Sequence, residues 1–430
     1  MRTTFKAPAC FCILLLTTSV AGAAEGISLA DAIECRPRSG LPNALARLKG
    51  GQELTVAYIG GSITAQNGWR PKTTAWLKQQ YPTAKVVEID AAIGGTGSDL
   101  GVFRFRQDVL DHHPHLIFIE FAVNDGGAPP QQIYRCMEGM VRQAWKQDSK
   151  TDICFVYTLV DSFVPTIQSG KFPRAASAME RVAEHYQISS IHMGLEVARL
   201  AKEGKLILKV DPKTEQERTA LKDKIVFSAD GVHPHPETGH QLYLEAIARS
   251  FEKMKDNATP AAHKLPDPFV ADNYENAKLV SLSKAKLSEG WEKLDPQKNP
   301  QARAFRKYLP EMYYAAEPGQ SLSFSFKGRL VGFIDLLGPD CGQLQMTIDD
   351  AKLTTVARFD AYCTYHRIGS FIAGQDLSDS VHSIRVTVDD RELDKAAILA
   401  RNGNKIENPK RFAGKGWYVG SIMLIGDLAD

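Results

Sequence analysis

The sequence lacks an excess of charge of either sign. Its 430 residues contain 52 lysines and arginines against 50 aspartates and glutamates, which gives a formal net charge of +2. Proteins that hold nucleic acid through phosphate contacts usually show a strongly basic domain or a long basic tract. The composition therefore argues against nucleic acid as a partner, although it leaves room for a local basic patch.

Long apolar segments are also missing. The run from Cys10 to Val20 follows the positive residues Arg2 and Lys6 and precedes the small residues 21–24. It is shorter than the ~20 apolar residues that span a bilayer, and its flanks are those of a secretory signal peptide. We expect residues 1–24 to be a signal peptide, no membrane span in the rest of the chain, and a secreted or periplasmic protein.

Cysteine is scarce, and removal of the signal peptide leaves five, an odd number. In a compartment that permits disulfides, at least one thiol must then stay unpaired. Cys341 and Cys363 could pair, whereas Cys136 and Cys154 lie in apolar patterns typical of core thiols. The spacings match no zinc motif, and we expect neither a metal nor an organic cofactor.

The sequence does contain a regular alternation of strand and helix patterns up to residue 256. Short apolar runs alternate with amphipathic stretches, which is the pattern of a parallel sheet covered on both faces. We expect strands at 54–59, 86–93, 116–122, 153–160 and 188–191, and helices at 41–48, 69–81, 100–112, 133–146, 174–186 and 242–254. The charged stretch 202–224 is expected to be a surface excursion and a candidate rim of a substrate cleft.

A change of period marks a second domain. After a proline-rich linker at 257–272, short β-rich runs separated by turn signals predict an antiparallel β-sandwich of jelly-roll type over 273–430. The expected strands are 321–326, 330–336, 344–348, 354–359, 365–372, 383–388 and 417–424. Six aromatic residues of this domain could either stack on sugar rings or pack its core: Trp291, Tyr313, Tyr314, Tyr362, Tyr365 and Trp417.

Candidate catalytic residues lie at two places in the first domain, residues 25–256. Gly60 and Gly61 allow a sharp turn that presents Ser62 at the carboxyl end of a strand, where open α/β sheets form their active sites. Far downstream, Asp230 and His233 are three residues apart. At that spacing the acid can orient the imidazole, and the imidazole can take a proton from a serine hydroxyl.

Four ordered blocks resemble those of the SGNH, or GDSL-type, serine hydrolase superfamily. They are GGSIT with Ser62, AAIGGTGS with Gly95, FAVND with Asn124, and DGVH with Asp230 and His233. The resemblance implies a flavodoxin-like three-layer α/β/α domain in which Ser62 is the nucleophile, His233 the general base and Asp230 its orienting acid. It also implies an oxyanion hole made by the backbone N–H groups of Ser62 and Gly95 and the side-chain amide of Asn124.

The chain departs from this family at Gly61, because the family's usual motif there is Gly-Asp-Ser. The missing aspartate is not the acid of the triad, so we interpret its absence as a trait of a subfamily.

The resemblance also implies a function, since many secreted relatives with an added β-sandwich are carbohydrate esterases. We predict that the chain removes O-acetyl groups from a carbohydrate or polysaccharide through an acyl-enzyme. The alternatives are an aryl or lipid esterase similar to a lysophospholipase, and a polysaccharide O-acetyltransferase that uses the same triad. A glycan-binding protein with a dead site is disfavoured by the intact candidate residues. The expected partner is an acylated carbohydrate, and the oligomeric state is left open.

Overall fold

The computed structural model describes residues 27–221, 223–256, 259–349 and 351–429. The expected signal peptide, residues 1–24, lies outside the described residues. Among the described residues, no helix combines the length and the apolar character that a bilayer crossing requires.

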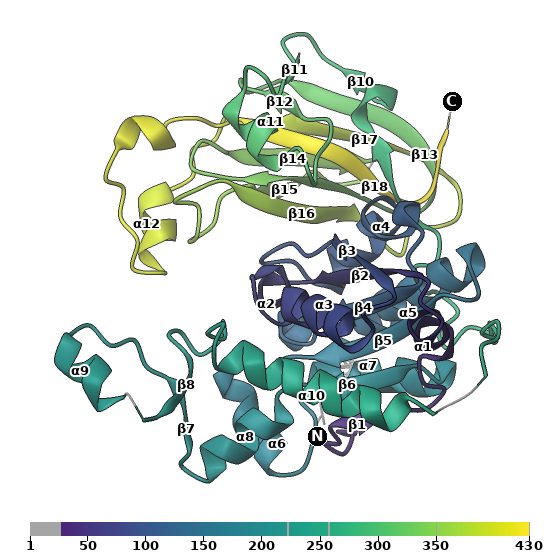
Figure 1. The fold of residues 1–430 in the computed structure, drawn as a ribbon. Coiled ribbons are helices and arrows are strands. Elements are labelled where there is room, and N and C mark those ends of the chain that lie inside the picture. The colour runs from purple at the N-terminus through teal and green to yellow at the C-terminus, as the bar shows by residue number, and fades with distance from the viewer. Residues whose placement is uncertain (1–26, 222, 257–258, 350, 430) are drawn as a thin grey trace, which may run out of the picture.

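The first part of the chain is built on a six-stranded sheet in the order β1-β6-β5-β4-β2-β3 (Figure 1). Strands β2 to β6 are parallel, and their order is that of the flavodoxin fold. The expected α/β class is therefore confirmed. The strands are β1 Cys35–Arg36, β2 Glu53–Gly60, β3 Lys85–Asp90, β4 Leu116–Glu120, β5 Asp152–Tyr157 and β6 Ser189–His192.

Helices cover both faces of this sheet. The α-helices are α1 Pro42–Lys49, α2 Ser62–Ala65, α3 Trp69–Gln80, α4 Ser98–Asp108, α5 Pro130–Gln147, α6 Val164–Gln168, α7 Arg174–Tyr186, α8 Leu195–Lys202 and α10 Gly239–Met254. Short 3-10 turns are η1 Leu110–His112, η2 Asn124–Gly127 and η3 Asp161–Phe163. Several elements were not expected from the sequence, among them α2, α6 and the following two. The edge strand β1 is antiparallel to β6 and only two residues long, and α8 lies where no helix was predicted.

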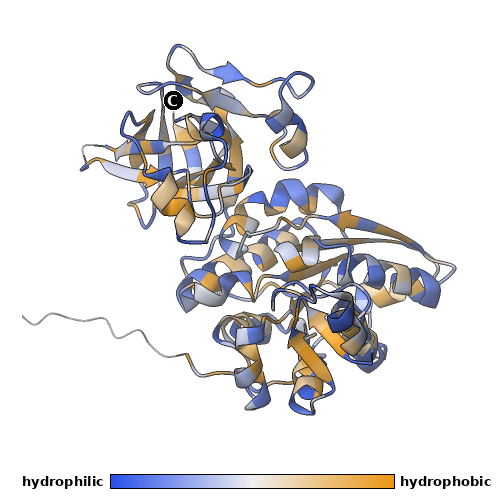
Figure 2. Cartoon of the chain, turned by 90° about the vertical axis from the view of Figure 1, so that its left-hand side faces the viewer, coloured by the Kyte–Doolittle hydropathy of each residue, from blue (hydrophilic) through white to orange (hydrophobic). Residues whose placement is uncertain are grey.

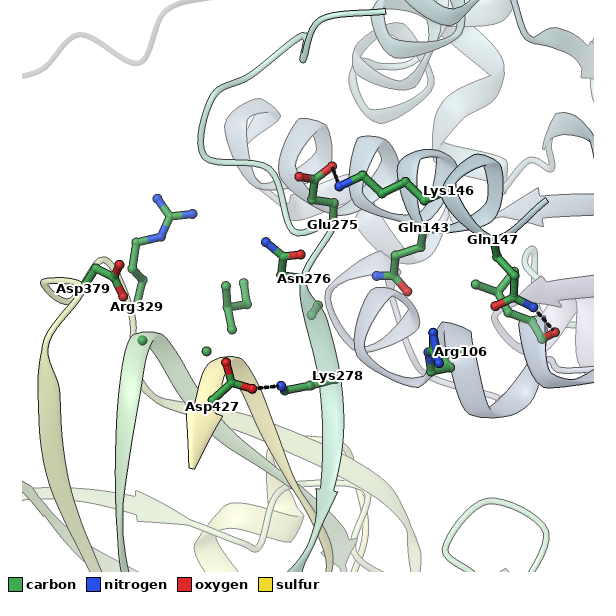
Figure 3. Close-up of a pocket in the computed structure, with 15 residues that line it drawn as sticks. Arg106, Gln143, Lys146, Gln147, Glu275, Asn276, Lys278, Arg329, Asp379 and Asp427 are labelled. Atoms are coloured by element: carbon green, nitrogen blue, oxygen red, sulfur yellow. Dashed lines mark hydrogen bonds and ion pairs between the residues drawn. The ribbon is translucent and has the colours of Figure 1, made fainter. Parts of the chain in front are cut away.

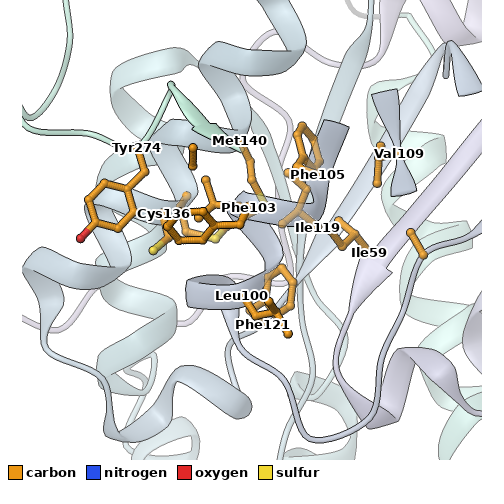
Figure 4. Close-up of a cluster of buried hydrophobic side chains, with 14 of the residues drawn as sticks. Ile59, Leu100, Phe103, Phe105, Val109, Ile119, Phe121, Cys136, Met140 and Tyr274 are labelled. Atoms are coloured by element: carbon orange, nitrogen blue, oxygen red, sulfur yellow. The ribbon is translucent and has the colours of Figure 1, made fainter. Parts of the chain in front are cut away.

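Strand β2 shows how the sheet divides the core into two layers. Ala57 and Ile59 point into the cluster formed with α4, α5 and α7 (Figure 4), whereas Val56 and Tyr58 point into the cluster with α1, α3 and α10. Successive side chains of a strand point to opposite faces, so a strand buried on both faces must be apolar throughout. This explains the continuous apolar run that leads to Ser62. Apolar residues, orange in Figure 2, accordingly mark many of the strands.

The charged excursion is more ordered than a loop. It contains β7 Leu206–Lys209, α9 Glu215–Ala220 and β8 Ile225–Ser228, and the two strands form a small parallel sheet. In Figure 1 this unit projects from the body of the molecule on the side where α2 lies.

The second part is an antiparallel ten-stranded sheet folded into a sandwich, as expected. Its strands are β9 Ala277–Ser281, β10 Lys286–Leu287, β11 Glu292–Lys293, β12 Tyr313–Ala315, β13 Ser321–Leu337, β14 Gln343–Ile348, β15 Thr354–Ala357, β16 Arg367–Gly374, β17 Val381–Val388 and β18 Trp417–Ala429. Its helical turns are η4 Leu282–Lys284, α11 Pro300–Phe305, α12 Lys395–Ala400 and η5 Pro409–Phe412.

Strand β13 corrects one expectation. The sequence predicted two strands, 321–326 and 330–336, but the structure has one long strand that pairs with β17 through its first half and with β16 through its second half. The ladder to β18 shifts register at Gly328, where an added Cβ would lie 2.3 Å from the carbonyl oxygen of Ile425. The glycine therefore permits close strand contact at an irregularity, and it does not end the strand.

The two parts of the chain share buried contacts. Leu330 and Ile425 of the sandwich belong to the same apolar cluster as α4 and α5. The segment expected to be a linker also packs against the first part, because the Glu138 carboxylate accepts backbone N–H bonds from Phe269 and Val270 at 2.5 and 2.8 Å. Tyr274 then inserts between α4 and α5 (Figure 4).

The structure decides between the alternatives for the cysteines and for some aromatic residues of the sandwich. Among the described cysteines, all five are buried free thiols, so Cys341 and Cys363 do not pair. Trp417 and Tyr313 are buried in the core, which favours the packing interpretation for them. Tyr362 and Tyr365 are exposed.

Candidate active site

Ser62 begins helix α2 directly after strand β2, at the end of the sheet where parallel strands present their carboxyl termini. The two glycines before it are required by close packing. A Cβ on Gly60 would lie 2.6 Å from the carbonyl oxygen of Glu120, and a Cβ on Gly61 would lie 1.9 Å from Asn124 Oδ1. Because the Asn124 side chain occupies that space, the family's aspartate has no room at position 61.

His233 and Asp230 lie on the loop between β8 and α10 and reach Ser62. His233 Nε2 is 2.8 Å from Ser62 Oγ, and His233 Nδ1 is 2.7 Å from Asp230 Oδ2. The other carboxylate oxygen, Oδ1, accepts the backbone N–H groups of Val232 and His233, both at 2.8 Å. Asp230 therefore fixes both the turn and the ring that the turn carries. The three residues predicted from two distant motifs form one continuous hydrogen-bonded chain.

The charge of Asp230 is strongly stabilised. Partial burial raises the pKa of this carboxyl, but the hydrogen bonds from the His233 ring and from two backbone N–H groups outweigh it and bring the pKa to about 2. The side chains of His233 and Asp230 are 37% and 52% exposed, so water reaches both. An ionised acid on Nδ1 favours the tautomer in which Nε2 can accept the Ser62 proton.

The other two predicted residues flank the serine. Gly95 follows β3 with φ +75°, and the neighbouring Gly94 lies close enough to Ser62 that an added Cβ would be 3.6 Å from the serine Cβ. Asn124 begins the turn η2 after β4 and packs on Gly61. The structure thus brings backbone and amide groups from three separate loops to the serine. Their role as an oxyanion hole stays a prediction.

Asp125 connects two of these loops and was not singled out from the sequence. Its Oδ1 accepts the backbone N–H of Ser98 at 3.0 Å, at the start of α4, and Gly97 allows this close approach. Its other oxygen, Oδ2, is buried without a hydrogen-bond partner among the described residues. Burial raises the pKa of Asp125 to about 7. The carboxyl therefore holds the turn that carries Asn124 against the glycine loop that carries Gly95.

Glu120 is a second group that sequence reasoning missed. It is fully buried at the end of β4 and accepts hydrogen bonds from the hydroxyls of Thr158 at 2.7 Å and Thr64 at 3.0 Å, and from the backbone N–H of Gly61. Burial raises its pKa to about 7 although these bonds lower it. Glu120 thus holds the turn that carries Ser62, through its hydrogen bonds to Gly61 and Thr64. The signal was available, since it is the one charged residue in the apolar run LIFIEFA.

His240 is a buried residue that holds the segment after Ser62 by hydrogen bonds. It is buried, its Nδ1 accepts the backbone N–H of Trp69 at 3.1 Å, and its Nε2 lies 3.0 Å from Gln66 Oε1. Burial lowers its pKa to about 4, so the ring is neutral at physiological pH. It holds the segment that follows Ser62.

Other candidate sites lie away from the serine. Among the described residues, the group of side chains that could hold a metal is Asp340, Cys341 and His366 in the sandwich, where Asp340 and His366 are already hydrogen bonded at 2.6 Å. A polar pocket of about 600 Å³ lies between the two parts of the chain (Figure 3). Its charged side chains are partly paired with one another, as in Lys278 with Asp427, and none of the predicted site residues lines it.

Comparisons with known proteins bear on the family and the fold of the chain. The model of the GDSL-like lipase/acylhydrolase family matches residues 58–242. A search of curated protein sequences finds no match. A crystal structure of a two-domain esterase (CEX) active on acetylated mannans shares 19% identity and a TM-score of 0.69, over 91% of this chain and 97% of that chain.

A second crystal structure of a two-domain esterase (CEX) active on acetylated mannans, co-crystallised with mannopentaose, shares 20% identity and a TM-score of 0.67. It covers 90% of this chain and 94% of that chain. At this identity the likeness shows the fold, and it extends over both parts of the molecule. The family match covers residues 58–242, most of the α/β part, and this part of the chain is therefore similar to the GDSL-like lipase/acylhydrolase family of carboxylic ester hydrolases.

Proposed function

We propose that the chain is a carbohydrate O-acetylesterase that works through a Ser62, His233 and Asp230 triad. The observation that carries the proposal is the hydrogen-bonded chain from Asp230 through His233 to Ser62 Oγ, with links of 2.7 and 2.8 Å. A serine hydroxyl is a poor nucleophile near neutral pH, and a base within hydrogen-bond reach removes that barrier.

The reaction follows from these contacts. Ser62 Oγ attacks the ester carbonyl carbon while its proton passes to His233 Nε2, and the carbonyl oxygen becomes an anion. The N–H groups of Ser62 and Gly95 and the amide of Asn124 stabilise that anion. His233 then returns the proton to the departing sugar oxygen, which leaves acetyl on Ser62. Water, deprotonated by His233, then attacks the acyl carbon; the bond from that carbon to Ser62 Oγ breaks, His233 returns the proton to Oγ, and the acid product leaves as acetate.

The substrate class is supported by the similar structures. The two crystal structures described above, which match both parts of the chain, are of an esterase active on acetylated mannans. An acetylated carbohydrate is accordingly the substrate we propose for this chain, with no metal or organic cofactor in any step.

We also propose export of the chain, from the pattern of residues 1–24. After expression in a bacterial host with a matching secretion system, the amino terminus of the secreted protein should begin near Glu25. Recovery of the uncleaved chain from the cytoplasm would contradict this proposal.

Release of acetate from a panel of acetylated polysaccharides, together with 4-nitrophenyl esters of increasing chain length, tests the proposed function. We expect release that depends on Ser62, is absent in Ser62→Ala, and falls steeply beyond acetyl. Preference for long acyl chains would indicate a lipid or aryl esterase. Transfer of acetyl to an added glycan without free acetate would indicate an acetyltransferase.

A further inference from the structure

The sandwich carries a segment whose charge differs from the rest of the chain. Residues 391–415, here called the α12 arm, form most of the connection between β17 and β18 and contain α12 and η5. The arm holds seven lysines and arginines and three acids, and the two residues before it, Asp389 and Asp390, are acidic as well, so the full connection 389–416 has a formal net charge of +2. The whole chain carries the same net charge over 430 residues, so positive charge is concentrated in this connection.

Much of this positive charge has no partner among the residues that the structure describes. Arg391 pairs with Asp389, Lys415 lies 3.5 Å from Glu392, and Lys395 is held internally. Four exposed cations of the arm have side chains without an ion pair or hydrogen bond to any described residue: Arg401, Lys405, Lys410 and Arg411. Some lysines elsewhere in the sandwich have a carboxylate partner, as Lys278 has in Asp427 and Lys293 in Glu311, whereas others, such as Lys284 and Lys327, have none among the described residues.

Hydrogen bonds and a small apolar cluster hold the α12 arm in place. The Lys395 ammonium donates to the carbonyl oxygens of Pro339, Phe412 and Gly414 at 2.8, 2.9 and 2.7 Å, and so ties both ends of the arm to the sandwich. Leu399 is fully buried in a small apolar cluster beneath the arm. The unpaired cations are thus presented on a fixed surface, which lowers the entropy that a ligand would lose in ordering them.

Two exposed aromatic rings lie on the loop that packs against this arm. Tyr362 and Tyr365 are 56% and 55% exposed, and neither ring contacts another aromatic ring of the described residues. The side-chain amide of Asn404, in the arm, donates to the backbone carbonyl of Ala361 at 2.9 Å. Exposed aromatic faces combined with a phenol hydroxyl suit a partner that is apolar on one side and polar on the other. A sugar ring has that character.

The arm extends on the same side of the molecule as the candidate active site. Figure 1 shows α12 reaching outward above α2, the helix that begins with Ser62, while the β7, α9 and β8 unit reaches outward below it. A long polymer that presents an acetyl group to Ser62 would therefore have the arm available to contact its remaining length.

We propose that the α12 arm, with Tyr362 and Tyr365, binds an anionic polysaccharide, so that the substrate is an acetylated glycan bearing uronic-acid carboxylates. This inference rests on the proposed esterase function and narrows its substrate class. The unpaired cations meet the carboxylates, and the tyrosines contact the sugar rings. A neutral acetylated mannan offers no anion to the four cations.

Binding is measured with the full-length Ser62→Ala protein, so that the result does not depend on turnover. The ligands are acetylated polygalacturonan and acetylated mannan, in affinity electrophoresis at 50 and 200 mM NaCl. We expect tighter binding of the anionic glycan and weakening at the higher salt, because exposed charges are screened over about 8 to 10 Å near physiological salt.

Charge-removing variants locate the surface. Each exposed ion pair changes an affinity by about 1.4- to 5-fold, so removal of all four cations, as R401Q, K405Q, K410Q and R411Q together, should weaken binding about tenfold or more. Tyr362→Ala with Tyr365→Ala should weaken binding at both salt concentrations. The matched control removes four exposed cations elsewhere in the sandwich: K284Q, K286Q, R306Q and K327Q together, which should bind as the parent does.

Several results would overturn the inference. These are equal binding of both glycans, unchanged affinity of the quadruple arm variant, an equal loss in the control variant, or retention of anionic phospholipid vesicles but not of the glycan. Failure of the proposed function is separate, because the protein would then bind the anionic glycan while wild type releases no acetate from either polymer.

Discussion

Substitution of Gly61 by alanine tests the geometry of the candidate site most directly. The added Cβ would lie 1.9 Å from Asn124 Oδ1, and ordinary contact begins near 3.4 Å, so the amide must move by about 1.5 Å. Gly61 has φ −88° and ψ −154°, an extended conformation that alanine also adopts. The substitution therefore acts on Asn124 and adds no backbone strain of its own.

The expected effect is the loss of one oxyanion donor. Such a loss typically lowers kcat by about 10²- to 10³-fold, which corresponds to about 2.7 to 4 kcal/mol of transition-state stabilisation. KM for 4-nitrophenyl acetate should change little, because the donor acts on charge that develops in the transition state. Steady-state kinetics with thermal melting of the same samples separates this effect from unfolding.

A double-mutant cycle provides the control. Asn124→Ala should reproduce the loss, and Gly61→Ala combined with Asn124→Ala should lose no more than either change alone, because both remove the same donor. Gly127→Ala lies in the same turn, where an added Cβ meets no atom within 4 Å, and should retain activity. Near-normal kcat in Gly61→Ala, or full additivity of the two losses, would refute the assignment of Asn124.

Three further predictions follow from the contacts. Asp230→Asn should lower kcat by about 10²- to 10⁴-fold at nearly constant KM in acetate-release assays. A variant that turns over as fast as the wild type would contradict the assignment of the triad. Buried Glu120 has a pKa of about 7 and keeps a proton that the unfolded chain loses near pH 4.3. Its contribution to stability is therefore full below pH 4.3 and declines up to pH 7, by at most about 1.4 kcal/mol per pH unit. Urea denaturation at pH 5 and 7 should show a weaker decline in Glu120→Gln, and an unchanged slope would contradict the reasoning. Arg358→Met removes the ion-pair partner of buried Asp335, which keeps the hydrogen bond from Trp417 Nε1 at 2.9 Å, and should lower the free energy of unfolding by about 3–5 kcal/mol. Asp335→Asn added to it should restore part of that loss in the same assay.

The sequence predicted the α/β sheet well because its strands are buried on both faces. Strand β4, LIFIE, is apolar apart from one residue. Where strands and helices alternate along the chain, so short an apolar run is typical of a buried strand. The short edge strand β1 escaped detection because two residues cannot show a period. Its partner β6 supplies the pairing, and this contact is not encoded locally.

The sandwich was harder to divide into strands for the same physical reason. A glycine inside a strand pattern signals either a turn or a close approach of two backbones, and the local sequence is identical in both cases. At Gly328 the close approach to Ile425 decides the outcome, and that contact spans almost one hundred residues of sequence. Long-range pairing of this kind cannot be read from a window of a few residues.

Some residues of the candidate site were likewise predictable from the sequence, and others were not. Ser62, Asp230 and His233 were found because their chemistry requires particular residue types near turns, and the structure brings them together. Glu120 and Asp125 were missed because they act through buried hydrogen bonds to backbone and hydroxyl groups. Such bonds become apparent only when the loops they join are placed.

The exposure of the triad bears on the choice between hydrolysis and acyl transfer. A transferase must keep water away from its acyl-enzyme, since water at high concentration otherwise competes with the acceptor hydroxyl. Here the His233 and Asp230 side chains are 37% and 52% exposed, and the hydrogen bond between them already holds the ring toward Ser62. The imidazole that would activate the second nucleophile is thus open to solvent without any closure of the site. Water needs no further structure to reach it and would compete with any acceptor sugar bound at the α12 arm, which favours hydrolysis.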